Sequence, residues 1–314
     1  IAASCGGDDD VTSDTTPVTE PAATDAPAAT DAPAATDAPA APAATDAPAA
    51  GASGAVFDQA LADLLPADVR DAGVLTLATD PTDPPLEFYN EDNEIVGAEV
   101  DVAAALGTVL GIDVELVPSK FDAIIPGVEA GRFDGALSGF ADRVERQQLV
   151  DFVDFYTTSR GYLIRTDSMP GLDEATDLCG LKVAVAKGTT MADAIGGLSD
   201  DCTAAGKDAI ESQVFPDQAA GVLAVQSGRS DLTILSGHAS LAIAQASDGL
   251  LDVVLRPNEG QDVNGILLRK GDLTAAIQPA IQQLMDSGAL LDIMTEWNLQ
   301  DIMLDEATVN AGTN

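Results

Sequence analysis

Two short turns in this sequence combine glycine with hydroxyl or basic residues, the types that bind a small anion. They are residues 138–143 (SGFADR) and residues 187–190 (KGTT), and each follows an apolar run. In open α/β sheets, ligands bind beyond the carboxyl ends of strands, where helix N-termini present free N–H groups and partial positive charge. Each turn could hold a carboxylate, although glycine and hydroxyl residues after a strand also form ordinary turns and helix caps.

The segments that would position these turns alternate between short apolar runs and longer amphipathic ones. Composition and spacing predict strands at residues 74–79, 112–118, 134–138, 161–165, 181–186, 231–235, 251–255 and 264–269. They predict helices at residues 99–110, 122–130, 273–287 and 290–297. This alternation predicts an α/β fold with mostly parallel sheets.

The first part of the chain has a different composition. Residues 8–54 are almost entirely Asp, Thr, Ala and Pro, and the unit Thr-Asp-Ala-Pro-Ala-Ala recurs from Thr24, Thr30, Thr36 and Thr45. Such a segment has little apolar surface to bury, and its prolines forbid a continuous helix. We expect residues 1–54 to form a disordered tether and the folded part to start near Ala55.

The charge balance argues against nucleic acid as a partner. Asp and Glu number 52 against 14 Lys and Arg, for a net charge of −38. The sequence has no Lys or Arg cluster that could follow a phosphate backbone. A soluble acidic surface explains the excess.

The first residues resemble the end of a bacterial lipoprotein signal peptide. Small residues precede Cys5, and glycine and three acids follow it. Cleavage before Cys5 would leave a cysteine that carries lipid, and several acyl chains give stable anchoring. We therefore expect an extracytoplasmic protein held at the outer face of the cell membrane through Cys5. The alternative is a free cysteine in a flexible tail.

The other two cysteines, Cys179 and Cys202, are expected to form a disulfide, because an even pair in an exported chain favours one. The bond would contribute about 3 kcal/mol in the chain-entropy model. These two cysteines and the single histidine, His238, do not make a set of zinc ligands, so we expect no metal site.

Seven stretches, taken in order, resemble the family 3 extracellular solute-binding proteins, the polar amino-acid receptors of ABC importers. The seven include GRFDGALSG at 131–139 and VAVAKGTT at 183–190. The full set is residues 75–88, 95–102, 121–127, 131–139, 145–152, 183–190 and 228–231. The resemblance runs from about Leu75 to Trp297 and so covers essentially the whole folded part.

The resemblance implies two α/β lobes of the periplasmic-binding-protein type 2 fold, joined by two crossover hinge strands and closing on a ligand. Lobe one would comprise residues 56–158 and 262–314, and lobe two residues 159–261. It also implies a small-molecule ligand, no cofactor, and an ABC transporter permease as partner.

Site residues follow from the resemblance by position. Arg146 is similar to the arginine that grips the ligand's α-carboxylate, which suits a planar guanidinium fork. Ala141, Thr189 and Thr190 are similar to further carboxylate contacts, and Asp80 to an acid that faces the ligand side chain. Phe121 is similar to a residue that forms an apolar wall of the crevice. Ser138 and Gly139 are similar to residues whose backbone lines the crevice.

Two positions depart from the family pattern. Asp83 stands where many relatives have an aromatic residue, and Ser236 stands where the family usually has the aspartate that pairs with the α-ammonium. Either Asp83 or Asp142 could supply the missing charge, or the ligand lacks a standard α-amino group. An acid-rich crevice favours a cationic ligand, so a polar or basic amino acid or a derivative is expected.

We expect no enzyme activity. His238 near a helix start is expected to be solvated, and no Ser-His-Asp or Cys-His arrangement is indicated. The alternative is an enzyme similar to the cyclohexadienyl dehydratases of the same fold, which use crevice acids. A sensor ectodomain would need a transmembrane helix and a signalling domain after the binding fold, and the sequence shows neither.

Overall fold

The computed structural model describes residues 54–168, 172, 175–257 and 259–313. All of them belong to one compact unit, residues 46–314. Cys5 and residues 1–53 of the predicted tether lie outside the described residues. Among the helices of the described part, none is long and apolar enough to cross a membrane.

Six strands form the first large sheet, in the order β14-β7-β13-β6-β1-β5. Strand β1 pairs in parallel with β5 and β6, and the other neighbours in this sheet are antiparallel. The bounds are β1 (Val74–Thr79), β5 (Asp113–Pro118), β6 (Gly135–Ala136), β7 (Val150–Thr158), β13 (Asp262–Arg269) and β14 (Met303–Val309). A small hairpin sheet precedes β5 and consists of β2 (Thr82–Asp83), β3 (Glu87–Tyr89) and β4 (Ile95–Val96).

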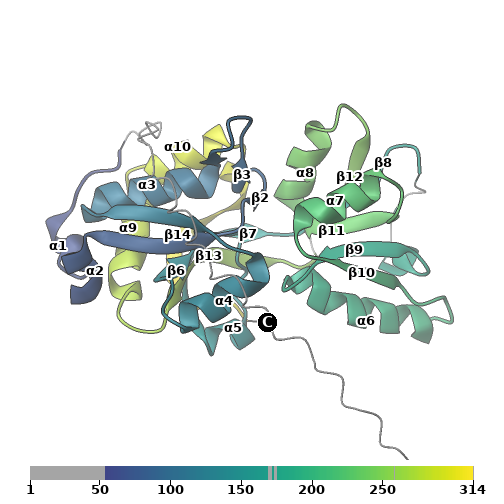
Figure 1. Cartoon of the computed structure of the whole chain (residues 1–314), viewed down its shortest axis with the longest axis horizontal. Helices are drawn as coiled ribbons and strands as arrows, with labels where there is room; N and C mark the ends of the chain where they lie inside the picture. The colour runs from purple at the N-terminus through teal and green to yellow at the C-terminus, as the bar shows by residue number, and fades with distance from the viewer. Residues whose placement is uncertain (1–53, 169–171, 173–174, 258, 314) are drawn as a thin grey trace, which may run out of the picture. The chain divides into compact units, whose positions relative to one another are not determined.

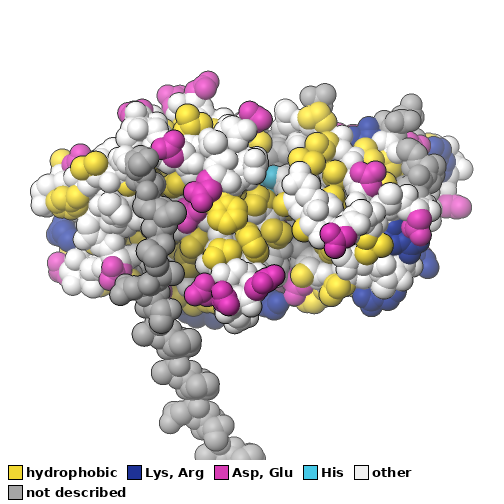
Figure 2. Space-filling model, turned by 90° about the horizontal axis from the view of Figure 1, so that it is seen from above, with side chains coloured by type: hydrophobic (Ala, Val, Ile, Leu, Met, Phe, Trp, Pro, Cys, Tyr) yellow, Lys and Arg dark blue, Asp and Glu magenta, His cyan; other side chains and the backbone are white. Residues whose placement is uncertain are grey.

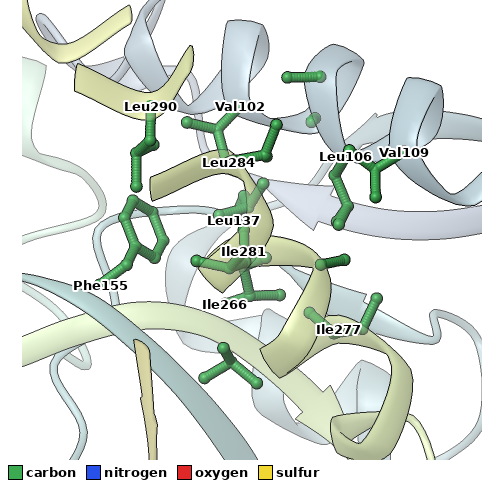
Figure 3. Packing of buried hydrophobic residues seen from close by; sticks show 14 of the residues in the cluster. Val102, Leu106, Val109, Leu137, Phe155, Ile266, Ile277, Ile281, Leu284 and Leu290 are labelled. Atoms are coloured by element: carbon green, nitrogen blue, oxygen red, sulfur yellow. The ribbon is translucent and has the colours of Figure 1, made fainter. Parts of the chain in front are cut away.

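Helices cover this sheet (Figure 1). They are α1 (Gln59–Ala62), α2 (Ala67–Ala72), α3 (Ala98–Leu110), α4 (Phe121–Glu129), α5 (Val144–Gln147), α9 (Thr274–Asp286) and α10 (Ala289–Glu296), with a short 3-10 turn at Gln300–Ile302. Figure 3 shows the largest core, where apolar side chains of α3, α9 and α10 pack against Phe155 and Ile266 of the sheet. Helix α3 ends at Gly111, whose left-handed backbone (φ 66°) suits glycine at a helix end.

Five strands form the second large sheet, in the order β10-β9-β11-β8-β12. The bounds are β8 (Arg160–Arg165), β9 (Lys182–Ala186), β10 (Glu211–Phe215), β11 (Leu232–Ser236) and β12 (Leu251–Arg256). Its helices are α6 (Thr190–Ala204), α7 (Gln218–Gln226) and α8 (Gly237–Gln245), with a 3-10 turn at Ala175–Leu178. The core of this sheet contains the disulfide between Cys179 and Cys202, which confirms the predicted pairing.

The chain passes between the two sheets twice, from β7 to β8 and from β12 to β13. The two passages lie side by side, because Thr158 pairs with Asp262 and the amide of Arg160 donates to the carbonyl of Glu259 at 3.0 Å. Two adjacent single-strand connections are what a hinge requires. That the sheets move as two lobes with the expected boundaries remains our proposal.

The α/β fold is confirmed, but the expectation of mostly parallel sheets is wrong. In the two large sheets of the described residues, four strand pairings are parallel and five are antiparallel. The connections between the sheets explain the difference. The chain leaves the first sheet along β7 and returns along β13, so these neighbours run in opposite directions, and β8 and β12 do the same in the second sheet.

Candidate functional site

The two turns singled out from the sequence lie at one cleft. Residue Ala141 of the first turn forms a bridge with Asn264 of β13, which ties this turn to the first sheet. In the second turn the hydroxyl of Thr189 accepts a hydrogen bond from the amide of Ala192 at 3.2 Å and so caps α6. The N-terminal amides of a 15-residue helix thus begin at the cleft, where they favour an anion.

Residues of both sheets line the cleft, which holds about 540 Å³ of empty space that is partly open to solvent. Eight of the ten residues expected at the site line it: Asp83, Phe121, Gly139, Ala141, Arg146, Thr189, Thr190 and Ser236. The other two, Asp80 and Ser138, line a smaller adjoining cavity that shares Asp83, Phe121 and Thr189 with the cleft. The structure therefore brings the ten positions together in one region.

Arg146 is fixed by both hydrogen bonds and ring contacts. Its Nη1 donates to the carbonyl of Ala141 at 2.9 Å, and its Nη2 donates to the carbonyl of Gly188 at 3.1 Å. The guanidinium carbon lies 5.3 Å from the ring centroid of Phe140, which stacks on Phe121 with centroids 4.3 Å apart. Burial lowers the pKa of Arg146. The guanidinium has five N–H donors, so others remain for a ligand carboxylate.

Behind the cleft, Asp83, Glu87 and Glu99 form a buried group of acids, and none of them forms an ion pair with a basic side chain among the described residues. The hydroxyl of Ser138 donates to Glu87 at 3.0 Å, and the hydroxyl of Tyr156 donates to Glu99 at 2.9 Å. Burial raises the pKa of both Glu87 and Glu99. Burial and, to a lesser extent, the nearby charge of Glu99 raise the pKa of Asp83 to about 7. A cation beside these carboxyl groups would stabilise their charged forms and lower their pKa values.

Asp80 lies next to this group. Its carboxylate accepts a hydrogen bond from the amide of Phe121 at 2.9 Å, and its own amide donates to the hydroxyl of Ser138 at 2.8 Å. Burial raises the pKa of Asp80. Asp80 therefore fixes the start of α4 and adds negative potential at the inner end of the cleft.

Asp142 does not take the place of the missing aspartate. Its carboxylate oxygens accept hydrogen bonds from the side-chain amide of Gln147 at 2.8 Å and from the amide of Gly312 at 2.7 Å. Asp142 is buried and does not line the cleft. Of the two acids suggested from the sequence, only Asp83 borders the space where a ligand would lie.

His238 is half-buried in the cleft, whereas the sequence led us to expect a solvated side chain. Its side chain lines the cleft, and its Nε2 lies 2.9 Å from the hydroxyl oxygen of Ser236. Burial lowers the pKa of His238 to about 4, so the imidazole is neutral at physiological pH. Figure 2 shows the histidine (cyan) as a small visible patch beside hydrophobic side chains.

Several further cleft residues were missed from the sequence: Thr158, Ala186, Met191, Gln218, Ile234, Leu235, His238 and Asn264. Gln218 follows Asp217, which caps α7 after β10. Helices were expected between the strands, but no bounds were predicted for α7, and β10 was missed. An aspartate before an apolar run was the available signal for that helix start. Asn264 was placed at the start of a predicted strand, where nothing local marked it as a site residue.

Two α/β sheets are joined by paired crossings, and each contributes a glycine-containing turn to a shared cleft, an arrangement suited to binding a solute. Residues 75–300 match the bacterial extracellular solute-binding proteins of family 3, and the chain belongs to that family. The arginine-binding protein ArgT of Corynebacterium glutamicum is 32% identical over 249 residues, which cover 79% of this chain and 81% of that protein.

Solved structures give the same result. An ancestral arginine-binding protein bound to arginine is 27% identical, with a TM-score of 0.64, and the match covers 72% of this chain and 98% of that one. An ancestral amino-acid-binding protein described as a precursor of cyclohexadienyl dehydratase is 26% identical, with a TM-score of 0.64, and the match covers 73% and 97%. The expected family and two-sheet fold are thereby confirmed.

Proposed function

We propose that this chain binds a basic amino acid, arginine foremost, and delivers it to an ABC importer. One observation carries the proposal: the guanidinium of Arg146 and the buried carboxyl group of Asp83 line the same cleft. A molecule with a carboxylate at one end and a cation at the other fits that pair of charges. The arginine-binding relative in Corynebacterium glutamicum supports the choice of arginine.

The ligand carboxylate would lie between the two sheets. Arg146 offers a planar fork of donors from the first sheet, and the start of α6, with Thr189 and Thr190, offers hydroxyl and amide donors from the second. Because one carboxylate would contact both sheets, binding would favour a closed arrangement of the proposed lobes.

The cationic side chain would reach the acids. Asp83 is 7% exposed, and one of its carboxyl oxygens has no hydrogen-bond partner. A guanidinium or ammonium group would satisfy that oxygen and stabilise the charged carboxylate. The stacked rings of Phe121 and Phe140 would cover the aliphatic part of the ligand. Asp83, which replaces a family aromatic, would thus exchange a stacking contact for a charge contact.

We propose further that Cys5 carries the lipid anchor and that residues 6–54 act as the tether to the membrane. This proposal rests on the small residues before Cys5 and the repeated Thr-Asp-Ala-Pro-Ala-Ala unit. Cys5→Ser should release the protein from the membrane fraction without changing ligand affinity. Unchanged membrane association would contradict the anchor.

We propose binding without turnover. The dehydratase alternative deserves a direct test, because buried acids with raised pKa values, such as Asp83, can donate protons to a leaving group. Incubation with arogenate or prephenate should give no phenylalanine or phenylpyruvate. Product formation that depends on Asp83 would replace the transport function with an enzymatic one.

The proposed function is tested by calorimetric titration with arginine, lysine, histidine, glutamine and cystine. Arginine or another basic amino acid should bind with the highest affinity. Arg146→Ala should cost roughly 2–4 kcal/mol of binding free energy, because it leaves a desolvated carboxylate unpaired. Lys270→Ala, on an ion pair with Asp151 that lies outside the cleft, is the control and should change affinity little. Tight binding of an uncharged sugar, or full affinity in Arg146→Ala, would reject the proposal.

A further inference from the structure

Two buried acceptor atoms border the cleft without a hydrogen-bond partner in the described part of the chain. They are Oδ1 of Asp83 and Oδ1 of Asn264. Leaving a buried acceptor unsatisfied costs about 1–3 kcal/mol, so such atoms at a cleft indicate a ligand donor. The proposed function uses Asp83 for the ligand side chain. The oxygen of Asn264 has no role in it.

The orientation of the Asn264 amide is set by its neighbour. Its Nδ2 donates to the carbonyl oxygen of Gly139 at 3.1 Å. A carbonyl oxygen only accepts hydrogen bonds, so the nitrogen must face it and Oδ1 must be the end without a partner. The side chain is 2% exposed, and the register of β13 against β7 shifts between Asn264 and Gly265. A bulge at this point re-aims a side chain, as bulges beside binding sites do.

Asn264 also lies close to the proposed carboxylate contact. Arg146 donates to the carbonyl of Ala141 at 2.9 Å, and Ala141 forms a bridge with Asn264. A single residue therefore links the guanidinium to the asparagine. The carboxylate and ammonium groups of an amino acid share one α-carbon, so their partners in the protein must be similarly close.

Ser236 cannot fully replace the aspartate that this position usually holds. Its hydroxyl oxygen accepts from the amide of Ala239 at 3.4 Å and lies 2.9 Å from Nε2 of His238. These contacts occupy part of the hydroxyl's hydrogen-bonding capacity, and a neutral hydroxyl carries no charge to pair with an ammonium group. Near Arg146, the asparagine oxygen is a buried acceptor with no partner among the described residues.

We propose that Oδ1 of Asn264 accepts a hydrogen bond from the α-ammonium group of the bound amino acid. The inference rests on the proposed function, in which Arg146 holds the carboxylate and Asp83 the side-chain cation. Three separate contacts on the groups around one α-carbon also discriminate between its two enantiomers. The cleft would thus recognise the α-amino group with a neutral amide in place of a carboxylate.

A double-mutant cycle tests this contact, with Asn264 changed in the protein and the α-amino group removed from the ligand. The probes are L-arginine and 5-guanidinopentanoate, which differ only in the α-amino group. Wild-type protein should bind arginine roughly 10- to 100-fold more tightly, the range expected for one hydrogen bond to a charged group. In Asn264→Leu the two affinities should agree within about threefold, since the partner of the amino group is gone.

A purely structural role for Asn264 gives a different result. Loss of the hydrogen bond to Gly139 would weaken both probes by the same factor and leave their ratio unchanged, which would overturn the inference. Asn264→Ser, whose shorter side chain cannot reach the same position, is the second variant and should also lose the preference if Asn264→Leu does not fold. Gln278→Leu is the matched control, because Gln278 donates its amide to the carbonyl of Ala307 at 2.8 Å and lies outside the cleft.

The outcomes separate the two proposals. If wild-type protein binds none of the amino acids in the panel, the proposed function fails. If it binds arginine and the Asn264 variants keep the full preference over 5-guanidinopentanoate, the function stands and the role of Asn264 is rejected. If lysine binds more tightly than arginine, the probes become lysine and 6-aminohexanoate, with the same expected ratios. Equal binding of both probes by the wild type also rejects the inference.

Discussion

The imidazole of His238 and the hydroxyl of Ser236 form a hydrogen-bonded pair at the cleft, 2.9 Å from Nε2 to Oγ. Both groups are neutral, so the pair adds no negative charge to the cleft. Burial explains why the histidine stays neutral, because its charged form would lose hydration without gaining a carboxylate partner.

The first prediction concerns the titration of this histidine, whose pKa is lowered to about 4. Because the chain has one histidine, its ring protons give a single set of NMR signals. We expect no chemical-shift titration between pH 5.5 and 8. A folded-state pKa below the unfolded value of about 6.5 adds stability above pH 6.5 that is lost as pH falls toward 4. A titration midpoint near 6.5 would contradict the burial of His238.

The second prediction concerns Asp83, whose pKa is raised to about 7. A raised folded-state pKa means that stability falls as pH rises from about 4 through 7, because the buried carboxyl group must then ionise. Asp83→Asn should raise the free energy of unfolding by about 1–3 kcal/mol at pH 8 and change it little at pH 5. Thermal denaturation at both pH values measures the difference. Asp305→Asn, on an exposed part of β14, is the control, and an equal effect there would argue against the buried-charge explanation.

The third prediction concerns Ser236→Asp. If the ligand has a free α-ammonium, a carboxylate at this position should leave affinity unchanged or improve it. A ligand without that group should bind far more weakly, because the new charge would stay buried and unpaired. Titration with arginine and 5-guanidinopentanoate distinguishes the two cases. Loss of arginine binding in a folded Ser236→Asp variant would show that position 236 does not lie beside the α-ammonium of bound arginine.

The fourth prediction concerns the disulfide between Cys179 and Cys202, which are 23 residues apart in sequence. Reduction should lower the free energy of unfolding by about 3 kcal/mol and the melting temperature by several degrees. Ligand affinity should hardly change, because neither cysteine lines the cleft. A marked loss of affinity on reduction would show that the bond also shapes the site.

Helices and strands whose ends are marked by neighbouring residues can be predicted from the sequence. Strand β1 was predicted with its observed bounds, and α3 was predicted within one residue because Gly111 ends it. Strand β7 was missed, since its residues are buried on both faces and lack a simple alternation. The mixed direction of the sheets depends on the pairing of β7 with β13, which lie more than a hundred residues apart. No local pattern carries that information.

The site divides in the same way. Arg146, Thr189 and Phe121 stand in motifs that can be read along the chain, and the structure places all three at the cleft. His238 and Asn264 reach the cleft only because α8 and β13 are packed beside it. The acids Glu87 and Glu99 become a buried group through the folding of a hairpin against α3. Their raised pKa values are a property of the packing and not of any motif.

The hydrogen bond from the amide of Arg160 to the carbonyl of Glu259 has a consequence for engineering. It shows that residues 160–259 leave and rejoin the rest of the chain at one point, so the second sheet is a cassette inserted between two strands of the first. A short turn that joins Ser159 to Gly260 would close β7 and β13 into a hairpin and should leave the first sheet intact. Conversely, a cassette from a relative could be grafted at the same junction, so that half of the binding surface is exchanged in one step.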